Sequence, residues 1–306
     1  MFDKRELIII GAGPSGLTAS IYASRYGLNV LVLGANHGGT ITDAHKVCNF
    51  PGYPEIPGPK LGLKIKKHAI KEGVDLKMEK VDRLKKKEQN FLLETNLGGK
   101  YSTKNLIVAT GTKRRKLGLN RENDFLGSGV SYCATCDGKF FENQKVGVIG
   151  GGNAATTAAL YLSELAEKVY LIYRGNKLKA VKSWQNKIVK QDNLEVIYGT
   201  EVERLNGNNH LESVNLSQSY NGSKKLDLEG LFIEIGSVPN VDIFNQLELT
   251  KDDKGYIKVD NEQKTSVESV WAAGDVTTNS NYFKQAVVSS GEGAVAANSV
   301  YKEIKG

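Results

Sequence analysis

Two glycine-rich segments, each placed between a strand and a helix, restrict the fold of this chain more than any other feature. An apolar strand at residues 6–10 runs into G-A-G-P-S-G at 11–16, and a second at 145–149 runs into G-G-G-N-A-A at 150–155; a helical pattern follows each. In this setting the glycines permit a tight turn, close approach of a pyrophosphate to the backbone, and close packing of helix on strand. The chain is therefore predicted to be α/β, with two nucleotide-binding units.

A second feature implies covalent chemistry. Cys133 and Cys136 are three residues apart, so their sulfurs can form a disulfide that opens and closes as a two-electron couple, and Asp137 beside them can exchange a proton. A purely structural disulfide fits poorly with three cysteines in 306 residues and no secretory signal. A zinc site is an alternative, because His45 and Cys48 would complete a Cys3His set; otherwise Cys48 is expected to be a buried small hydrophobe.

Composition and charge exclude several classes of protein. Hydrophobic residues make up 40% of the chain, and no apolar run approaches the roughly 20 residues of a membrane span. The net charge of +7 comes partly from lysine-rich stretches at 64–67 and 85–87, which either attract an acidic or phosphate-bearing ligand or form a solvated face. No nucleic-acid motif is present. We expect a cytoplasmic protein without a membrane or nucleic-acid partner.

The residues that follow each glycine-rich unit indicate which nucleotide it takes. The strand at 28–33 ends at Gly34, without the acidic residue that usually holds an adenosine ribose. The strand at 168–173 ends at Arg174, where an NAD-type enzyme would carry Asp or Glu, and Lys179 lies five residues on. A cationic strand end favours the 2′-phosphate of NADPH over NADH, although Arg174 can also be read as a surface residue.

The domain boundaries follow from the irregular stretches. Residues 112–119 are basic and irregular, and a Gly-Pro-containing stretch at 236–240 closes the second unit. The last piece has an apolar strand ending at Asp275 and a long helix at about 284–303, too little to fold alone. It is expected to return to the first domain, which gives domains at 1–115, 116–241 and 242–306.

Taken in order along the chain, these motifs resemble the low-molecular-weight thioredoxin reductases, which are FAD-dependent pyridine nucleotide-disulfide oxidoreductases. The resemblance rests on the two fingerprints, Gly38-Gly39, N-F-P-G at 49–52, A-T-G at 109–111, C-A-T-C-D at 133–137 and A-G-D at 273–275, and it covers essentially the whole chain. It implies two Rossmann-like domains with three β/β/α layers. The FAD domain (1–115 and 242–306) is discontinuous, the NAD(P) domain (116–241) is inserted, and the flavoprotein is a homodimer.

The resemblance also implies a mechanism. NADPH passes a hydride to FAD, the flavin reduces the Cys133–Cys136 disulfide with Cys136 facing it and Asp137 as proton donor, and Cys133 attacks the disulfide of thioredoxin or a thioredoxin-like protein. The inserted domain rotates about linkers near 112–116 and 239–243. The positions implied for FAD are Gly11, Gly13, Pro14, Ser15, Gly16, Gly39, Thr40, Asn49, Thr110, Gly111, Gly274, Asp275, Gln285 and Ala286. Those implied for NADP are Gly150, Gly152, Asn153, Ala154, Ala155, Arg174 and Lys179.

Departures from the family pattern keep other readings open. The family usually has His-Arg-Arg-x-x-x-Arg where this chain has Y-R-G-N-K-L-K at 173–179, and Thr40 stands where Gln is usual. Replacing Arg by Lys loses bidentate phosphate geometry. NADH, ferredoxin or a reduced deazaflavin are therefore alternative donors, and a glutaredoxin-like protein or a peroxidase is an alternative acceptor. A third hypothesis is a flavin-containing scaffold whose cysteines hold zinc.

Overall fold

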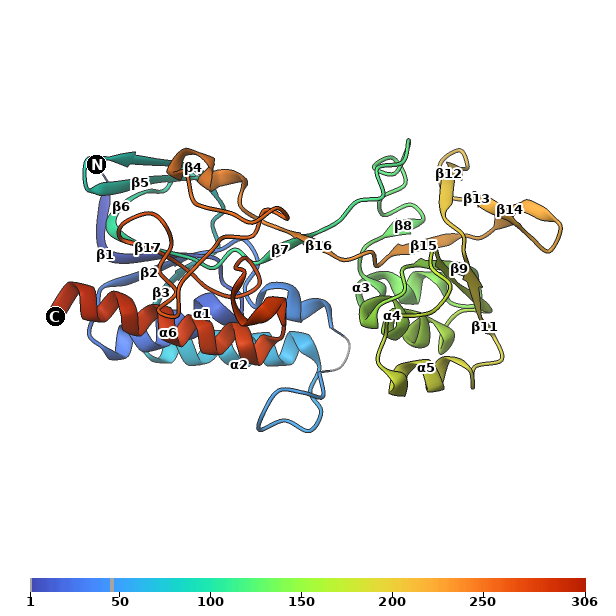
Figure 1. Cartoon of the computed structure of the whole chain (residues 1–306), viewed down its shortest axis with the longest axis horizontal. Helices are drawn as coiled ribbons and strands as arrows, with labels where there is room; N and C mark the ends of the chain where they lie inside the picture. The colour runs from blue at the N-terminus through green and yellow to red at the C-terminus, as the bar shows by residue number, and fades with distance from the viewer. Residues whose placement is uncertain (1, 45–46) are drawn as a thin grey trace. The chain divides into compact units, whose positions relative to one another are not determined.

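The computed structural model describes residues 2–44 and 47–306, which form two compact units (Figure 1). Met1–Lys113 and Val238–Gly306 make the first unit, and Arg114–Ser237 makes the second. The first unit is thus built from both ends of the chain. The expected boundaries at 115/116 and 241/242 fall within a few residues of these.

A mostly parallel sheet forms the middle of the first unit. Its strands run in the order β3-β2-β1-β6-β5-β4, with β17 also on β6. Their bounds are β1 Asp3–Ile10, β2 Val30–Leu33, β3 Asp75–Lys77, β4 Val81–Lys87, β5 Asn90–Thr95, β6 Lys100–Val108 and β17 Val270–Ala272. The parallel pairing of Trp271 with Ile107 joins the C-terminal segment to the sheet. This pairing makes the unit discontinuous.

Both faces of this sheet are covered, because successive residues of a strand point to opposite sides. Leu7 and Ile9 of β1 pack in one core with the helices, whereas Ile8 and Ile10 pack in another with Phe244. The helices are α1 Pro14–Arg25, α2 Gly58–Lys71 and α6 Ala286–Lys305, which lie together on one side of the sheet in Figure 1. Three short 3-10 turns complete the unit: η1 Gly39–Asp43, η3 Asp242–Leu247 and η4 Asn279–Tyr282. β1 and β6 run parallel and stop side by side, with Ile10 opposite Val108 at the carboxyl end of the sheet.

The second unit repeats the parallel arrangement on a smaller scale. Its parallel sheet has the order β11-β10-β9-β15-β8. An antiparallel sheet, β12-β13-β14, packs in a core on one face of the parallel sheet, and a second core lies on the other face. The strand bounds are β8 Val130–Ser131, β9 Lys145–Ile149, β10 Lys168–Tyr173, β11 Leu194–Tyr198, β12 Val202–Asn206, β13 Ser213–Tyr220, β14 Ser223–Asp227 and β15 Gly230–Ile233. Its helices are α3 Ala134–Asp137, η2 Gly138–Phe141, α4 Asn153–Ser163 and α5 Lys182–Ile188. Where the chain passes from one unit to the other and back, β7 Thr112–Arg114 pairs with β16 Ser237–Pro239.

The predicted α/β class with two Rossmann-like units is confirmed, and the differences from prediction are local. The structure also contains short elements that the sequence analysis did not predict, among them α5, β12 and β14. These elements are short and mostly polar, and few of their residues are buried: Ile188 in α5, Val202 and Leu205 in β12, and Leu226 in β14. Such segments have too few apolar positions to show a clear period. No helix among the described residues is long and apolar enough to cross a membrane.

Candidate active site

The first glycine-rich loop has the geometry of a nucleotide cradle. Gly11 has φ +118°, and a Cβ there would lie 2.1 Å from the Ala109 carbonyl oxygen; at Gly16 a Cβ would lie 1.9 Å from the Gly11 carbonyl oxygen. Gly13 precedes α1, makes no side-chain cap, and a Cβ on it would meet only Gly39 at 3.7 Å. Close backbone contacts therefore leave no room for a side chain at Gly11 or Gly16, whereas the backbone at the start of α1 stays accessible to an anion.

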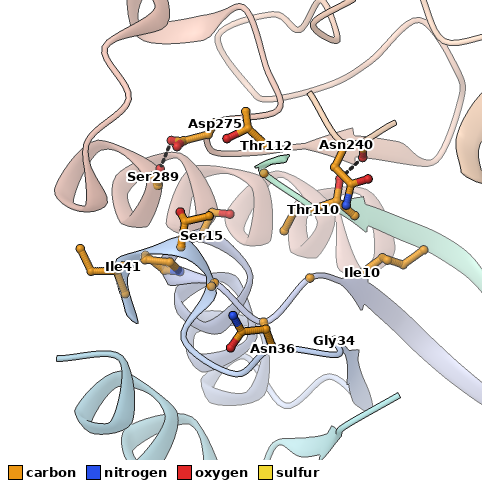
Figure 2. A pocket seen from close by; sticks show the side chains of 18 of the residues that line it. Ile10, Ser15, Gly34, Asn36, Ile41, Thr110, Thr112, Asn240, Asp275 and Ser289 are labelled. Atoms are coloured by element: carbon orange, nitrogen blue, oxygen red, sulfur yellow. Dashed lines mark hydrogen bonds between the residues drawn. The ribbon is translucent and has the colours of Figure 1, made fainter. Parts of the chain in front are cut away.

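A cavity of about 650 Å³ opens beside this loop, wholly within the first unit (Figure 2). It is lined by residues from the segments 10–15, 33–44, 47–49, 79–81, 109–112, 240–243 and 275–289. Most of the positions expected to hold FAD line it: Gly11, Gly13, Pro14, Ser15, Gly39, Thr40, Asn49, Thr110, Gly111, Asp275, Gln285 and Ala286. Gly16 and Gly274 do not line the cavity but pack against residues that do. Gly16 packs on Gly11, and a Cβ on Gly274 would lie 2.7 Å from Ser15 Oγ.

Hydrogen bonds hold the polar groups of this cavity in place. Ser289 donates to Asp275 Oδ1 at 2.9 Å, Asn49 Nδ2 donates to Gln285 Oε1 at 2.7 Å, and Thr110 Oγ1 donates to the Asn240 carbonyl at 2.7 Å. Figure 2 shows Asp275 and Ser289 on one side of the cavity and Thr110 with Asn240 on another. The Asp275 carboxylate is therefore oriented by α6.

Glu292 is a residue that the sequence reasoning missed. Its Oε2 accepts the Gly274 N–H at 2.7 Å and its Oε1 accepts the Ser280 hydroxyl at 2.6 Å, so it organises the loop that carries Asp275. Burial raises the pKa of Glu292, opposed by these hydrogen bonds. A signal was available, since Glu292 is a charged residue within a run of small and apolar residues at 286–300. Ser289 and Asn240 carried no such signal.

The second glycine-rich loop repeats the cradle in the second unit. Gly150 has φ +142°, and a Cβ there would lie 2.4 Å from the Glu234 carbonyl oxygen. Gly152 precedes α4 with φ −94°, and a Cβ on it would meet nothing within 4 Å. Ala155 is buried against the sheet, whereas Asn153 and Ala154 are exposed at the helix start, with Asn153 Oδ1 accepting the Val181 N–H at 2.8 Å.

The two expected phosphate-binding cations lie at the end of β10 and just beyond. The Lys179 N–H donates to the Gly151 carbonyl at 2.7 Å, which brings this residue to the loop. Arg174 is exposed and lies 3.7 Å from Glu201 Oε1. The Tyr173 ring occupies the space that a side chain on Gly151 or Gly175 would need. A Cβ on Gly151 would lie 2.5 Å from a ring carbon, and a Cβ on Gly175 would lie 2.7 Å from one. The ring thus explains why a glycine stands at 175.

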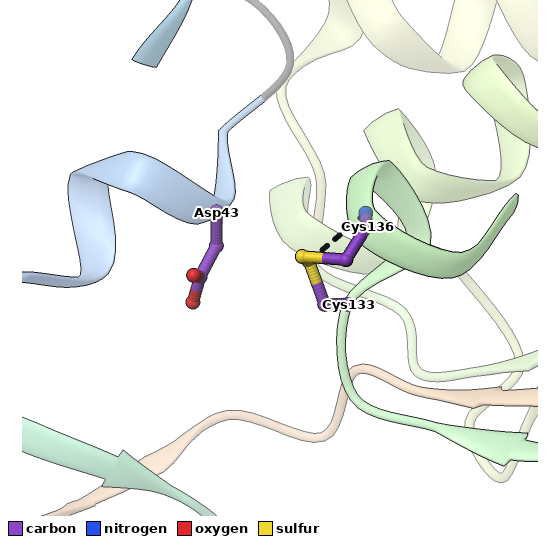
Figure 3. A group of neighbouring side chains, drawn as sticks. All are labelled: Asp43, Cys133 and Cys136. Atoms are coloured by element: carbon purple, nitrogen blue, oxygen red, sulfur yellow. Dashed lines mark hydrogen bonds between the residues drawn. A yellow bond between two sulfur atoms is a disulfide. The ribbon is translucent and has the colours of Figure 1, made fainter. Parts of the chain in front are cut away.

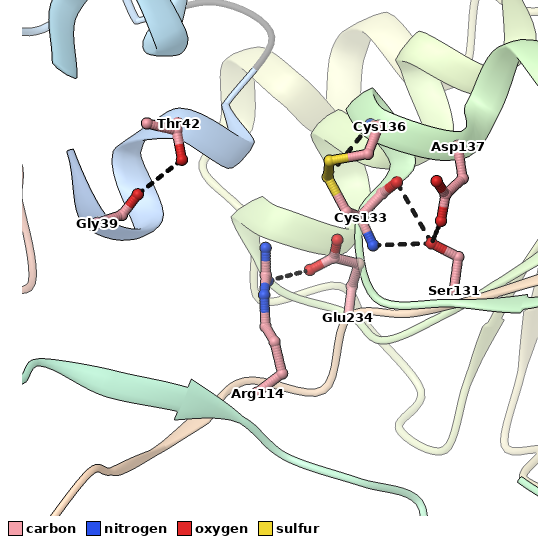
Figure 4. The surroundings of a disulfide bond; sticks show 8 residues. All are labelled: Gly39, Thr42, Arg114, Ser131, Cys133, Cys136, Asp137 and Glu234. Carbon is pink, nitrogen blue, oxygen red and sulfur yellow. Dashed lines mark hydrogen bonds and ion pairs between the residues drawn. A yellow bond between two sulfur atoms is a disulfide. The ribbon is translucent and has the colours of Figure 1, made fainter. Parts of the chain in front are cut away.

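The cysteine pair lies where β8 meets the short helix α3 (Figure 3). Cys133 and Cys136 form a disulfide, with their Cα atoms 5.3 Å apart. Cys133 is the residue before α3, and its sulfur accepts the Cys136 N–H at 3.2 Å. Ser131 donates to Asp137 Oδ2 at 2.7 Å and accepts the Cys133 N–H at 3.0 Å (Figure 4). The expected acid is therefore hydrogen-bonded to a group that also touches the cysteine backbone.

The third cysteine corrects one expectation. Cys48 is exposed in the first unit and not buried. It follows Val47, which bridges to Ile56; both of these side chains are buried, so the next side chain along the extended backbone points outward. His45, which the zinc alternative required, lies outside the described residues.

Comparison with known proteins places the chain in a family. The family model "Pyridine nucleotide-disulphide oxidoreductase" matches residues 5–293. The chain is 39% identical to the thioredoxin reductase of Treponema pallidum, over 96% of this chain and 95% of that protein. It belongs to the thioredoxin reductase family. The fold agrees: crystal structures of the Lactococcus lactis and T. acidophilum thioredoxin reductases each superpose with a TM-score of 0.91 at 32% identity. They cover 97% and 99% of this chain, and 98% and 99% of their own.

Proposed function

We propose that this protein is a thioredoxin reductase that carries electrons from NADPH through FAD to the Cys133–Cys136 disulfide and on to thioredoxin. The observation that carries the proposal is the disulfide itself, with Asp137 hydrogen-bonded beside it and a glycine cradle in the same unit. Family membership supports a flavin and a pyridine nucleotide as partners of that disulfide. The names of the relatives support thioredoxin as acceptor. A homodimer is proposed from the resemblance to the family, and a cytoplasmic location is proposed from the composition of the chain.

The cavity of the first unit fits FAD. Its volume of about 650 Å³ is in the range of cofactor sites. Gly11, Gly13 and the start of α1 would face the pyrophosphate, because no Cβ blocks the backbone there. Asp275, oriented by Ser289, would accept a hydrogen bond from a cofactor hydroxyl. Bound there, FAD would supply a two-electron carrier between a hydride donor and a disulfide.

The second cradle would hold the nicotinamide nucleotide. Gly150, Gly152 and Ala155 leave the backbone at the start of α4 accessible to a pyrophosphate, with Asn153 and Ala154 in the first helical turn. Arg174 and Lys179 supply positive charge at the end of β10, which would favour the 2′-phosphate of NADPH.

The chain's own residues then perform the thiol chemistry. Opening the Cys133–Cys136 disulfide takes two electrons and two protons. Asp137, the residue after Cys136 and hydrogen-bonded to Ser131, would give one proton to a thiolate of the opened pair. Cys133 is suited to attack the thioredoxin disulfide, because the Cys136 N–H that its sulfur accepts also stabilises a thiolate. Cys136 would then attack the mixed disulfide, release reduced thioredoxin and restore the Cys133–Cys136 bond.

A second candidate keeps this chemistry but takes NADH as donor. It is favoured by the glycine at 175, which leaves the 2′-phosphate with one cation fewer than the family pattern, and by the Glu201 carboxylate 3.7 Å from Arg174. A carboxylate in this position weakens the attraction of Arg174 for a phosphate.

An anaerobic titration of the purified yellow protein tests both candidates. Fast bleaching of the flavin by NADPH and slow bleaching by NADH support the proposal, and the reverse supports the second candidate. Failure of both, with bleaching by dithionite intact, would contradict both and point to ferredoxin or a reduced deazaflavin. Cys133→Ser and Cys136→Ser should each keep the flavin and lose thioredoxin reduction; turnover retained in either variant is incompatible with the mechanism.

A further inference from the structure

Ser131 stands out because its hydroxyl joins the attacking cysteine to the acid. It is the last residue of β8 and only 3% exposed. Its Oγ lies 2.7 Å from Asp137 Oδ2, 3.0 Å from the Cys133 nitrogen and 3.3 Å from the Cys133 carbonyl oxygen (Figure 4). All three contacts lie within the second unit.

A hydroxyl has one hydrogen to donate, and this restricts what Ser131 can do. The Cys133 N–H is always a donor, so Ser131 Oγ accepts it in every state. The hydroxyl hydrogen then has two acceptors, Asp137 Oδ2 and the Cys133 carbonyl oxygen. When Asp137 is ionised the hydrogen goes to the carboxylate. When Asp137 carries a proton, its O–H donates to Ser131 Oγ, and the serine hydrogen turns to the Cys133 carbonyl.

We propose that Ser131 is a positioning residue that keeps Asp137 hydrogen-bonded in both of its protonation states while the proton moves. The inference rests on the proposed function, in which Asp137 is the proton donor. The step moves no electrons: the Asp137 carboxylic acid becomes a carboxylate, and a thiolate of the opened cysteine pair becomes a thiol. At the same time the Ser131 hydrogen turns from the Cys133 carbonyl to Asp137. The Ser131 side chain is buried, and leaving its hydroxyl hydrogen without an acceptor in either state would be costly; the rotation avoids this.

The test is a double-mutant cycle on the full-length flavoprotein, with thioredoxin reduction as the assay. Ser131→Ala should lower kcat on the order of tenfold with little change in the KM for thioredoxin, a fraction of the 100-fold or more expected for losing a general acid. Asp137→Asn should lower kcat further. Adding Ser131→Ala to Asp137→Asn should then change kcat by less than about twofold, because a residue that acts through Asp137 has nothing left to position.

The pH profile separates positioning from a structural role. Both forms of Asp137 lose a hydrogen bond in Ser131→Ala, but the bond to the carboxylate is charge-assisted and is the stronger of the two. The descending limb of kcat against pH should therefore move to higher pH in this variant. Ser213→Ala is the matched control: Ser213 is 2% exposed in the same unit and accepts a side-chain N–H from Asn206 at 3.4 Å, away from the cysteines. It should leave kcat and the pH limb unchanged.

Several outcomes would overturn the inference. They are a wild-type kcat in Ser131→Ala, an unmoved pH limb, or equal losses from Ser131→Ala in the wild-type and Asp137→Asn backgrounds. If Ser131→Ala is too unstable to assay, Ser131→Thr carries the test, because it keeps the hydroxyl and should keep both kcat and the pH limb; loss of either counts against the inference. Full activity in Asp137→Asn would instead overturn the proposed role of the acid.

Discussion

The sharpest test of the nucleotide site uses Gly152. Its backbone has φ −94° and ψ −173°, which alanine adopts freely, and a Cβ would meet nothing within 4 Å. Gly152→Ala should therefore leave the free energy of unfolding unchanged or raise it by about 0.4–1 kcal/mol, since alanine reduces the entropy of the unfolded chain. Under the proposed function, however, the new methyl group stands where the nucleotide pyrophosphate approaches the backbone.

The expected loss follows from the hydrogen bonds displaced. One hydrogen bond to a charged phosphate contributes about 1.5–3 kcal/mol, and each 1.4 kcal/mol is tenfold in affinity. Gly152→Ala should thus raise the Kd for NADPH by about 10- to 100-fold. Flavin content and reduction by dithionite should be unchanged, because the cavity proposed for FAD lies in the other unit. Rapid-mixing measurement of flavin bleaching against NADPH concentration gives the Kd.

Gly150→Ala is the matched control. Its φ of +142° and the 2.4 Å approach of a Cβ to the Glu234 carbonyl oxygen predict a folding defect of about 1–3 kcal/mol, seen in urea unfolding. The two alanines, two residues apart, should therefore separate stability from binding. An unchanged Kd in Gly152→Ala, with full stability, would refute the placement of the pyrophosphate at this loop.

Three further predictions concern contacts outside the fingerprints. Gly175→Arg alone should destabilise the second unit by about 1–3 kcal/mol, because its Cβ would lie 2.7 Å from the Tyr173 ring. Adding Tyr173→His should recover part of this stability and lower the KM for NADPH relative to NADH. Stability losses that simply add in the double variant would contradict the contact. Glu292→Gln should change the pH dependence of the melting temperature. Because the pKa of Glu292 is raised in the folded protein, the folded protein binds more protons than the unfolded chain above the ordinary value of 4.5, and wild-type stability falls relative to the variant as pH rises through the folded pKa. Melting temperatures that change with pH in parallel in the two proteins would refute this. Glu234→Gln should cost about 1.5–3 kcal/mol in urea unfolding, because its buried carboxylate accepts from Arg114 at 2.7 Å; a cost removed by salt would show the pair to be solvent-screened.

Sequence reasoning succeeded where function depends on neighbours in the chain. A strand, a glycine fingerprint and a helix are contiguous, so the demands on Gly11 and Gly150 are set within a few residues, and the structure gives both the positive φ that the motif requires. The spacing of Cys133 and Cys136 likewise decides that their sulfurs can meet, and they do.

It was less complete where a contact joins distant segments. The resemblance predicted that Gln285 and Asp275 hold FAD, and both line the cavity of the first unit. Only the pairing of β17 with β6 shows why a segment near the C-terminus reaches this cavity. Glu292 was missed, and Cys48 was expected inside, because burial depends on which neighbours pack and composition does not specify them.

The class of fold, the two glycine-rich loops and the Cys133–Cys136 pair could be predicted from the sequence, because each is a local pattern with a local physical cause. How the side chains around them are held could be seen only in the folded protein. The Tyr173 ring fills the space beside Gly175, and Ser131 joins Cys133 to Asp137. These arrangements depend on rotamers and on close packing in three dimensions, which no spacing along the chain encodes.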